Sequence, residues 1–324
     1  MSTDEPVVLL LTDPAMAAHA SPGHPERPER VEAVVAGVAD GAQAAGARLV
    51  QRSAAPATDD MLTRVHEAAY LEWLVAQAAA GGGWLDPDTY LVEATPAAAW
   101  LAAGLATAAA EAVVSGEADV AFAAVRPPGH HADRDQGKGF CVLNNVAVAA
   151  ASLQASGAAR RVAILDWDVH HGDGTQSLVA ADPDTFYGST HQYPWYPGTG
   201  TTEESSDTVV NVPLAAGSGD EAFLTAWRDT ILPAAEAFAP AAILVSAGFD
   251  AHLDDPLARL MVTSTGFRTV ALEVGKLARG LGLRGVALTL EGGYALDALR
   301  ASAAATIEGL LAGLGPAPRR DSRE

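Results

Sequence analysis

A single cysteine, Cys141, is present among the 324 residues, so no disulfide can form within the chain. A lone thiol fits a reducing compartment. Basic residues are also scarce, because 20 Lys and Arg stand against 40 Asp and Glu and give a formal net charge of -20. Such a surface disfavours nucleic acid and anionic lipid as partners. Cationic peptides would be attracted, but solubility is the preferred explanation of the charge.

Long apolar runs are missing as well. The longest, residues 97–110, is mostly alanine, is flanked by Glu93 and Glu111, and is shorter than the roughly 20 residues that span a bilayer. The first residues, MSTDEPVVLLL, are acidic where a secretory signal would be basic. We therefore expect a cytoplasmic protein with no membrane partner, and the alanine-rich acidic composition suggests a bacterial source.

Short apolar runs alternate with helical patterns along the chain. This alternation predicts an α/β fold with a mostly parallel sheet of about eight strands, covered by helices on both faces. No linker or internal repeat interrupts it, so we predict one domain over residues 1–324 with a polar tail over about 315–324. The expected strands are 7–11, 48–54, 119–125, 161–168, 185–190, 208–214, 241–246 and 286–290.

Helices are expected between these strands, and their limits come from capping residues, glycine and proline. The segment 84–90, which contains Asp86-Pro87-Asp88, is expected to be a loop and is a candidate for a substrate rim. The expected helices are 29–44, 58–80, 95–115, 144–156, 176–180, 220–238, 265–281 and 296–312.

Ionisable motifs follow four of the predicted strands. They are DWDVHHGDG at 166–174, the histidine pair 130–131, Asp250 and Tyr294. In an open parallel sheet ligands bind at the carboxyl ends of the strands, so four such coincidences indicate one site. The alternative for each motif alone is an ordinary polar loop, and Cys141 is expected to be a small buried residue rather than a nucleophile.

A catalytic metal site needs three protein ligands and an open position, and Asp168, His170 and Asp250 can supply one nitrogen and two oxygens. Zinc fits this set and iron(II) is not excluded. Two carboxylates neutralise the cation, so a nearby base is needed, and the histidine pair 130–131 is suitable. Tyr294, between glycines and a helix start, can donate a hydrogen bond to a developing oxyanion.

Five motifs follow one another along the chain: RPPGHHA (126–132), GFC (139–141), DWDVHHGDGTQ (166–176), SAGFDA (246–251) and EGGY (291–294). In this order they resemble the motifs of the histone deacetylase family, and most closely those of its class II branch. HPERPER near the start and TPAAAWLAAG in the long helix extend the match over nearly the whole chain. The resemblance implies the three-layer α/β/α fold of the arginase and deacetylase proteins, which agrees with the alternation of strands and helices.

The resemblance implies one zinc ion per chain on Asp168, His170 and Asp250. It also implies that Arg30 matches an arginine of the family's product exit channel. A structural potassium ion would bind main-chain and side-chain oxygens around Asp166, Asp168, His170, Ser189 and Thr190.

Catalytic roles are implied for the remaining motif residues. His131 would be the main general base and His130 its electrostatic or acid partner, with Asp166 behind His130 and Asp173 behind His131. Tyr294 would polarise the acetyl carbonyl. Some class IIa members carry histidine at that position and are poor deacetylases, so tyrosine favours real activity.

Substrate-binding residues are implied on both walls of an acyl-lysine channel. Gly139 and Phe140 would line one wall, and Tyr196 is the best match for the aromatic residue of the other. Polyamine-specific relatives place a glutamate where this chain reads Asp-Pro-Leu at 255–257, so Leu257 favours acyl-lysine.

The predicted activity is zinc-dependent hydrolysis of N-ε-acetyl-lysine in a protein or peptide. Hydrolysis of an acetylpolyamine or another small acetylated amine on the same site is the alternative. An arginase-like enzyme with two manganese ions would want more carboxylates, and the complete catalytic set argues against an inactive acyl-lysine binding module. The sequence leaves open whether the chain forms a homo-oligomer.

Overall fold

The computed structural model describes residues 5–315, in which eight strands form one sheet whose neighbours all run parallel. This confirms the predicted parallel sheet of about eight strands. Of the polar tail expected over 315–324, residues 316–324 lie outside the described part. The spatial order is β2 (Arg48–Arg52), β1 (Val7–Leu11), β5 (Val120–Ala123), β10 (Val286–Leu290), β9 (Ala242–Ala247), β6 (Val162–Asp166), β7 (Thr185–Gln192) and β8 (Val209–Leu214).

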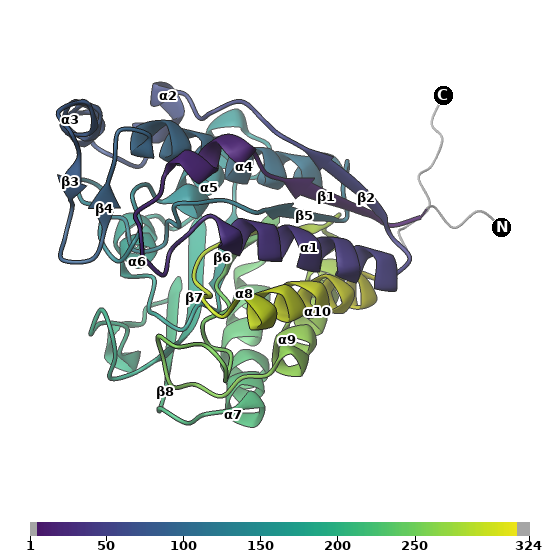
Figure 1. Ribbon diagram of the computed structural model, residues 1–324. Helices are drawn as coiled ribbons and strands as arrows, with labels where there is room; N and C mark the ends of the chain where they lie inside the picture. Colours follow the sequence, from purple (N-terminus) through teal and green to yellow (C-terminus); the bar gives the residue numbers. More distant parts are fainter. Residues whose placement is uncertain (1–4, 316–324) are drawn as a thin grey trace, which may run out of the picture.

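Helices cover both faces of this sheet, which gives three layers (Figure 1). Because successive side chains of a strand point to opposite faces, Leu9 joins the core beneath one helix layer and Leu10 the core beneath the other. One layer contains α4 (Thr95–Ser115) and α5 (Asn145–Ser156), and the other contains α1 (Glu29–Ala44), α7 (Asp220–Ala226), α8 (Leu232–Phe238), α9 (Ser264–Gly280) and α10 (Leu296–Leu314).

The remaining elements are short. A turn of π-helix over Trp227–Ile231 joins α7 to α8, so the helix expected over 220–238 is continuous. The others are α2 (Asp59–Leu62), α3 (Ala68–Ala79), α6 (Asp173–Val179), the strands β3 (Gly83–Trp84) and β4 (Tyr90–Leu91), and the 3-10 helices Pro14–Ala18 and Thr202–Glu204.

The helix expected over 58–80 is broken, which corrects the sequence prediction. The chain leaves α2 after Leu62, and α3 begins at Ala68. Between them the ring of His66 is buried, with Nδ1 2.9 Å from the carbonyl oxygen of Asp133 and Nε2 accepting from the Asn144 N–H at 2.9 Å. These long-range hydrogen bonds fix the segment between α2 and α3 in a non-helical conformation. The local hydrophobic periodicity of the sequence does not reveal them.

The loop expected over 84–90 is confirmed for residues 85–89, and the two-residue strands β3 and β4 on either side pair as a small antiparallel hairpin, with Gly83 opposite Leu91. Its turn is fixed by Asp86, whose Oδ1 accepts from the N–H groups of Asp88 at 3.0 Å and Thr89 at 2.6 Å. An aspartate that accepts from the following N–H groups is a common turn former. Asp88 therefore lies in the turn of this hairpin.

Helix α4 has 21 residues and is apolar enough to cross a membrane by length and composition, alone among the described helices. The run 97–110 considered from the sequence covers only part of it. However, 72% of its most apolar window is buried inside the protein. Packing in the core explains this composition without a bilayer.

Candidate active site

Four neighbouring strand ends bring the predicted motifs together. Asp168 and His170 follow β6, the histidine pair 130–131 follows β5, Asp250 follows β9 and Tyr294 follows β10. Strands β5, β10, β9 and β6 are consecutive in the sheet, so their carboxyl ends meet at one edge. The site is thus assembled from segments far apart in the sequence.

Asp168, His170 and Asp250 form a group that could hold a metal ion. Each offers one ligand atom, and these atoms lie within 4.8 Å of one another. His170 Nδ1 lies 3.0 Å from Asp168 Oδ1 and 3.2 Å from Asp250 Oδ2. One imidazole nitrogen and two carboxylate oxygens are a donor set that zinc accepts.

The surroundings of this group fit a cation. Asp250 Oδ2 is buried without a hydrogen-bond partner, and burial together with the negative charge of Asp168 raises the pKa of Asp250 to about 7. Glycine keeps space beside the carboxylates, because a Cβ at Gly292 would lie 2.0 Å from Asp250 Oδ2 and one at Gly248 would lie 2.0 Å from Asp168 Oδ2. A divalent cation would neutralise the two crowded carboxylates.

The two histidines of the pair are each held by their own carboxylate. His130 Nδ1 lies 3.1 Å from Asp166 Oδ2, and His131 Nδ1 lies 2.8 Å from Asp173 Oδ1. Their ring centroids are 4.0 Å apart. These are the contacts that the resemblance implied, and they fix the orientation of each ring through its Nδ1 atom.

The two rings differ in charge. Burial lowers the pKa of His131 to about 3, and the charge of His130 acts in the same direction. Burial also opposes protonation of His130, but the carboxylates of Asp168 and Asp166 outweigh it and raise the pKa of His130 well above its usual value. These directions favour a neutral ring at His131 and a charged ring at His130.

Two further residues stand behind the histidine carboxylates. The Tyr187 hydroxyl donates to Asp166 Oδ2 at 3.0 Å, and Lys138 Nζ lies 2.7 Å from Asp173 Oδ2. Sequence reasoning missed both, because Tyr187 belongs to an ordinary strand pattern and Lys138 to a loop. Only the tertiary fold shows which carboxylates they meet.

Tyr294 is positioned by groups from two other segments. Its N–H donates to Asp255 Oδ2 at 2.6 Å, and the guanidinium carbon of Arg30 lies 4.8 Å from its ring centroid. Arg30 Nε also donates to the Gly293 carbonyl oxygen at 2.6 Å. Burial raises the pKa of Tyr294 well above its usual value, so its hydroxyl remains a hydrogen-bond donor. Asp255 was missed as a positioning residue, and Arg30 supports the turn that bears Tyr294.

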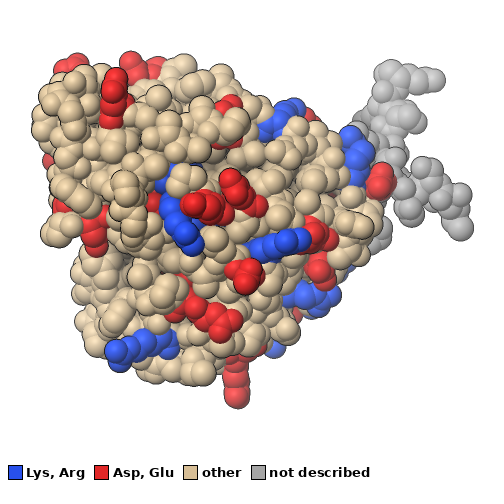
Figure 2. Space-filling model, in the orientation of Figure 1, with Lys and Arg blue, Asp and Glu red and all other residues tan. Residues whose placement is uncertain are grey.

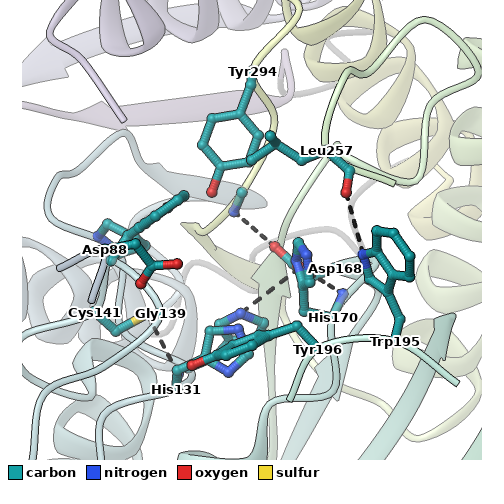
Figure 3. Close-up of a pocket in the computed structure, with 14 residues that line it drawn as sticks. Asp88, His131, Gly139, Cys141, Asp168, His170, Trp195, Tyr196, Leu257 and Tyr294 are labelled. Atoms are coloured by element: carbon teal, nitrogen blue, oxygen red, sulfur yellow. Dashed lines mark hydrogen bonds and ion pairs between the residues drawn. The ribbon is translucent and has the colours of Figure 1, made fainter. Parts of the chain in front are cut away.

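A cavity of about 250 Å³ joins these groups (Figure 3). The Tyr294 hydroxyl points into the space that His131 and His170 border. This volume lies below the ~300–1,000 Å³ of drug-sized sites and suits one extended side chain. The cavity is lined by Asp88, Pro128, His130, His131, Gly139, Phe140, Cys141, Asp168, His170, Trp195, Tyr196, Leu257, Gly292 and Tyr294.

Two aromatic rings that line the cavity lie next to His131 and Tyr294. Tyr196 has its ring centroid 5.1 Å from that of His131, and Phe140 has its centroid 5.8 Å from that of Tyr294. Sequence reasoning chose Tyr196 but missed Trp195, whose Nε1–H donates to the Leu257 carbonyl oxygen at 3.2 Å. This hydrogen bond connects the loop that carries Trp195 and Tyr196 to the segment that follows Asp250.

Gly139 and Phe140 both have left-handed backbones, with φ of 56° and 68°. A Cβ at Gly139 would lie 2.6 Å from His131 Cδ2, so both conformation and space require glycine there. The Gly139 N–H donates to Asp86 Oδ2 at 2.9 Å, and the Phe140 N–H donates to Thr89 Oγ1 at 2.8 Å. The hairpin at 83–91 thus supports this wall and brings Asp88 to the cavity.

The residues expected around potassium lie beside the metal group. Asp166 and Ser189 are register partners on β6 and β7, and the Asp168 N–H donates to Asp166 Oδ1 at 3.1 Å. Ser189 Oγ lies 2.9 Å from His191 Nδ1, and Thr190 Oγ1 accepts from the Trp227 indole at 3.2 Å. Potassium at this place stays a prediction.

Comparison with known proteins identifies the family. The family model described as histone deacetylase domain matches residues 24–310. A histone deacetylase-like amidohydrolase from Pseudomonas aeruginosa is 43% identical over 254 residues, which cover 76% of this chain and 67% of that protein. Histone deacetylase 14 of Arabidopsis thaliana, a chloroplastic protein, is 38% identical over 79% of this chain and 64% of its own length. Relatives of this kind therefore extend beyond the matched domain.

A solved structure agrees with these matches. The HDA15 HD domain superposes with a TM-score of 0.86 at 37% identity, covering 93% of this chain and 90% of that one. The family is zinc-dependent, and the group at Asp168, His170 and Asp250 is a candidate for its metal. The chain therefore belongs to the histone deacetylase family of amidohydrolases, as its five motifs predicted.

Proposed function

We propose that this protein is a zinc-dependent deacetylase that hydrolyses N-ε-acetyl-lysine in proteins or peptides to lysine and acetate. One observation carries the proposal. Two histidines, each held at Nδ1 by its own carboxylate and with ring centroids 4.0 Å apart, stand next to a three-donor metal group in a narrow cavity lined by aromatic rings. This arrangement provides a base, an acid and a place for a Lewis acid within one site.

Zinc held by Asp168, His170 and Asp250 would supply Lewis acidity to the amide carbonyl and to water. His131 would accept the proton of the attacking water as the new C–O bond forms. Tyr294 would donate its hydroxyl hydrogen to the oxygen of the carbonyl as negative charge develops there. The C–N bond then breaks, and the histidine pair returns a proton to the leaving amine.

Asp166 and Asp173 would act through the histidines. Each carboxylate would accept a hydrogen bond from the Nδ1–H of its histidine, which leaves Nε2 free for proton transfer. The same hydrogen bond fixes the orientation of the ring and stabilises its positive charge when it is protonated. Phe140 and Tyr196 would hold the methylene chain of the lysine between them, with Gly139 leaving room beside His131. Leu257 adds an apolar contact at the same wall.

A second candidate substrate, an acetylpolyamine or another small acetylated amine, is favoured by Asp88. This carboxylate lines the cavity, where it would attract a second ammonium group of a polyamine. Burial and the charge of Asp86 raise the pKa of Asp88 to about 6, so it is mostly ionised at neutral pH. Leu257 opposes this substrate, since it places no carboxylate on the other wall.

A comparison of kcat/KM for an acetyl-lysine peptide and for acetylspermidine, with zinc-loaded protein, tests the substrate class. We expect the peptide to be preferred, and preference for acetylspermidine would reject the acyl-lysine proposal. Asp88→Asn provides a matched control. If the natural substrate is an acetylpolyamine, this variant should lower kcat/KM for acetylspermidine more than kcat/KM for the acetyl-lysine peptide.

We also propose a structural potassium ion at Asp166, Asp168, His170, Ser189 and Thr190, and a cytoplasmic location. Asp166 and Ser189 share a register at the ends of two strands, which supports convergence of oxygen atoms there. If the ion binds only the folded state, replacing sodium chloride with potassium chloride at equal ionic strength should raise the thermal midpoint. An unchanged midpoint would count against the ion.

A further inference from the structure

A second group of possible metal ligands lies beside the proposed catalytic one. His130, Cys141 and Glu291 each offer one ligand atom, a nitrogen, a sulfur and an oxygen, and these atoms lie within 4.8 Å of one another. All three side chains are buried, with exposed fractions of 2%, 0% and 0%. They come from the segment after β5, from the loop before α5 and from the end of β10.

Glu291 has one engaged and one free oxygen. Its Oε2 accepts from the N–H groups of Gly129 at 2.6 Å and His130 at 3.1 Å, while its Oε1 is buried without a hydrogen-bond partner. An unpaired buried carboxylate oxygen is costly and calls for a partner. The deacetylation scheme above gives Oε1 no role.

Cys141 lines the cavity, so a small ion can reach it from the same entrance as the substrate. Its sulfur accepts a single hydrogen bond, from the His131 N–H at 3.4 Å. Burial and the charge of Glu291 raise the pKa of its thiol well above the usual value, which makes it a poor nucleophile. A metal ion would displace the thiol proton on binding.

His130 has one nitrogen to offer. Its Nδ1 lies 3.1 Å from Asp166 Oδ2, so Nε2 is the atom left for a metal, which would displace the Nε2 proton to solvent on binding. Nε2 lies 3.8 Å from Asp168 Oδ1. The carboxylates of Asp166, Asp168 and Glu291 surround the ring and make the place attractive to cations. The proposed proton transfer also involves this histidine.

We propose that His130, Cys141 and Glu291 form a second, inhibitory site for a thiophilic divalent cation such as zinc, distinct from the site at Asp168, His170 and Asp250. Thiolate, imidazole and carboxylate together select zinc, cobalt or cadmium over magnesium or potassium. An ion there blocks the histidine pair, so excess zinc stops turnover. Only this inhibition rests on the proposed function, since the site itself stands on the geometry.

The absorption spectrum of bound cobalt(II) distinguishes the two sites. The catalytic donors contain no sulfur, and Cys141 is the only cysteine of the chain, so a cobalt–thiolate charge-transfer band in the near ultraviolet reports the second site alone. The first equivalent of cobalt should bind without this band, and the second should produce it. The band should be missing from Cys141→Ala and from Cys141→Ser, while the first equivalent still binds.

Glu291→Gln keeps the shape of the side chain and removes its charge. It should weaken binding of the second cobalt by about tenfold or more, in keeping with the effect of altered ligand environments. The first equivalent and the circular dichroism spectrum serve as folding controls for all three variants.

Inhibition of the enzyme by added zinc is an independent test of the second site. Activity of the protein loaded with one zinc should fall as more zinc is added, and Cys141→Ala should shift this inhibition to about tenfold higher zinc or beyond, relative to its own starting rate. Absence of a thiolate band after the second equivalent, or a band already at the first, would overturn the assignment. If the protein deacetylates nothing, the cobalt spectra still decide the metal site, so failure of the two proposals can be told apart.

Discussion

Tyr294 is the residue whose hydroxyl we assign to the substrate rather than to the metal. Its ring is held by Arg30 and its backbone by Asp255, so the phenylalanine variant should keep the same position. We predict that Tyr294→Phe retains one zinc and lowers kcat by roughly a hundredfold or more, the usual loss for one oxyanion donor. Metal analysis and acetate release measure the two quantities. Full activity in this variant would remove the proposed role.

His66 is a buried histidine outside the site that should give the fold a pH dependence. Its Nδ1 donates to the Asp133 carbonyl oxygen and its Nε2 accepts from the Asn144 N–H, an arrangement that requires the neutral ring. Burial lowers the pKa of His66 to about 4 from 6.5. Between about pH 6.5 and pH 4 the unfolded chain is therefore protonated at this histidine while the folded chain is not. The free energy of unfolding decreases as the pH is lowered through that window.

The expected loss from this histidine is about 3 kcal/mol in the free energy of unfolding, because each pKa unit corresponds to about 1.4 kcal/mol. Urea unfolding of the wild type and of His66→Gln at several pH values measures it. The glutamine amide can donate to and accept from the same groups but does not titrate, so the variant should show a shallower pH dependence. Parallel curves for the two proteins would contradict the assignment.

At the scale of elements, the strand ends were predictable and the supports around them were not. The runs ending near Asp166 and Asp250 reveal buried strands, and their polar exits stand out in an apolar sequence. The break before α3 and the attachment of the hairpin at 83–91 to the cavity wall involve residues more than forty positions away, as in the contacts of His66 with Asp133 and Asp86 with Gly139. Local periodicity carries no record of such contacts, and the catalytic roles came from motif resemblance rather than from spacing.

Helices α1 and α10 pack side by side, with Gly41 of α1 against the backbone of α10 (Figure 1). A Cβ at Gly41 would lie 2.4 Å from the Ala304 carbonyl oxygen, which belongs to the backbone of α10 and cannot move easily. We predict that Gly41→Ala destabilises the protein by about 1–3 kcal/mol, the usual cost of overpacking. Gly280→Ala is the matched control, because a Cβ there meets nothing within 4 Å. Equal stability of the two variants would argue against the close packing.

At the scale of the whole molecule, the net charge of -20 should influence which peptides are captured. Figure 2 shows acidic side chains spread over one face with basic ones set among them, rather than a single charged patch. We predict that kcat/KM for an acetyl-lysine peptide with arginine neighbours falls between about 0.1 M and 1 M salt, as the screening length drops from ~10 Å to ~3 Å. A peptide with serine neighbours should change little. The same response from both peptides would leave solubility as the role of the charge.

The proposed activity depends on a metal ion bound where the four strand ends meet. The most direct measurement is acetate release from an acetyl-lysine peptide by protein stripped with a chelator and then given one equivalent of zinc. We predict no release from the stripped protein, recovery with zinc, and one free lysine amine for every acetate formed. Acetate release that survives complete stripping, or none after zinc is restored to folded protein, would contradict the account.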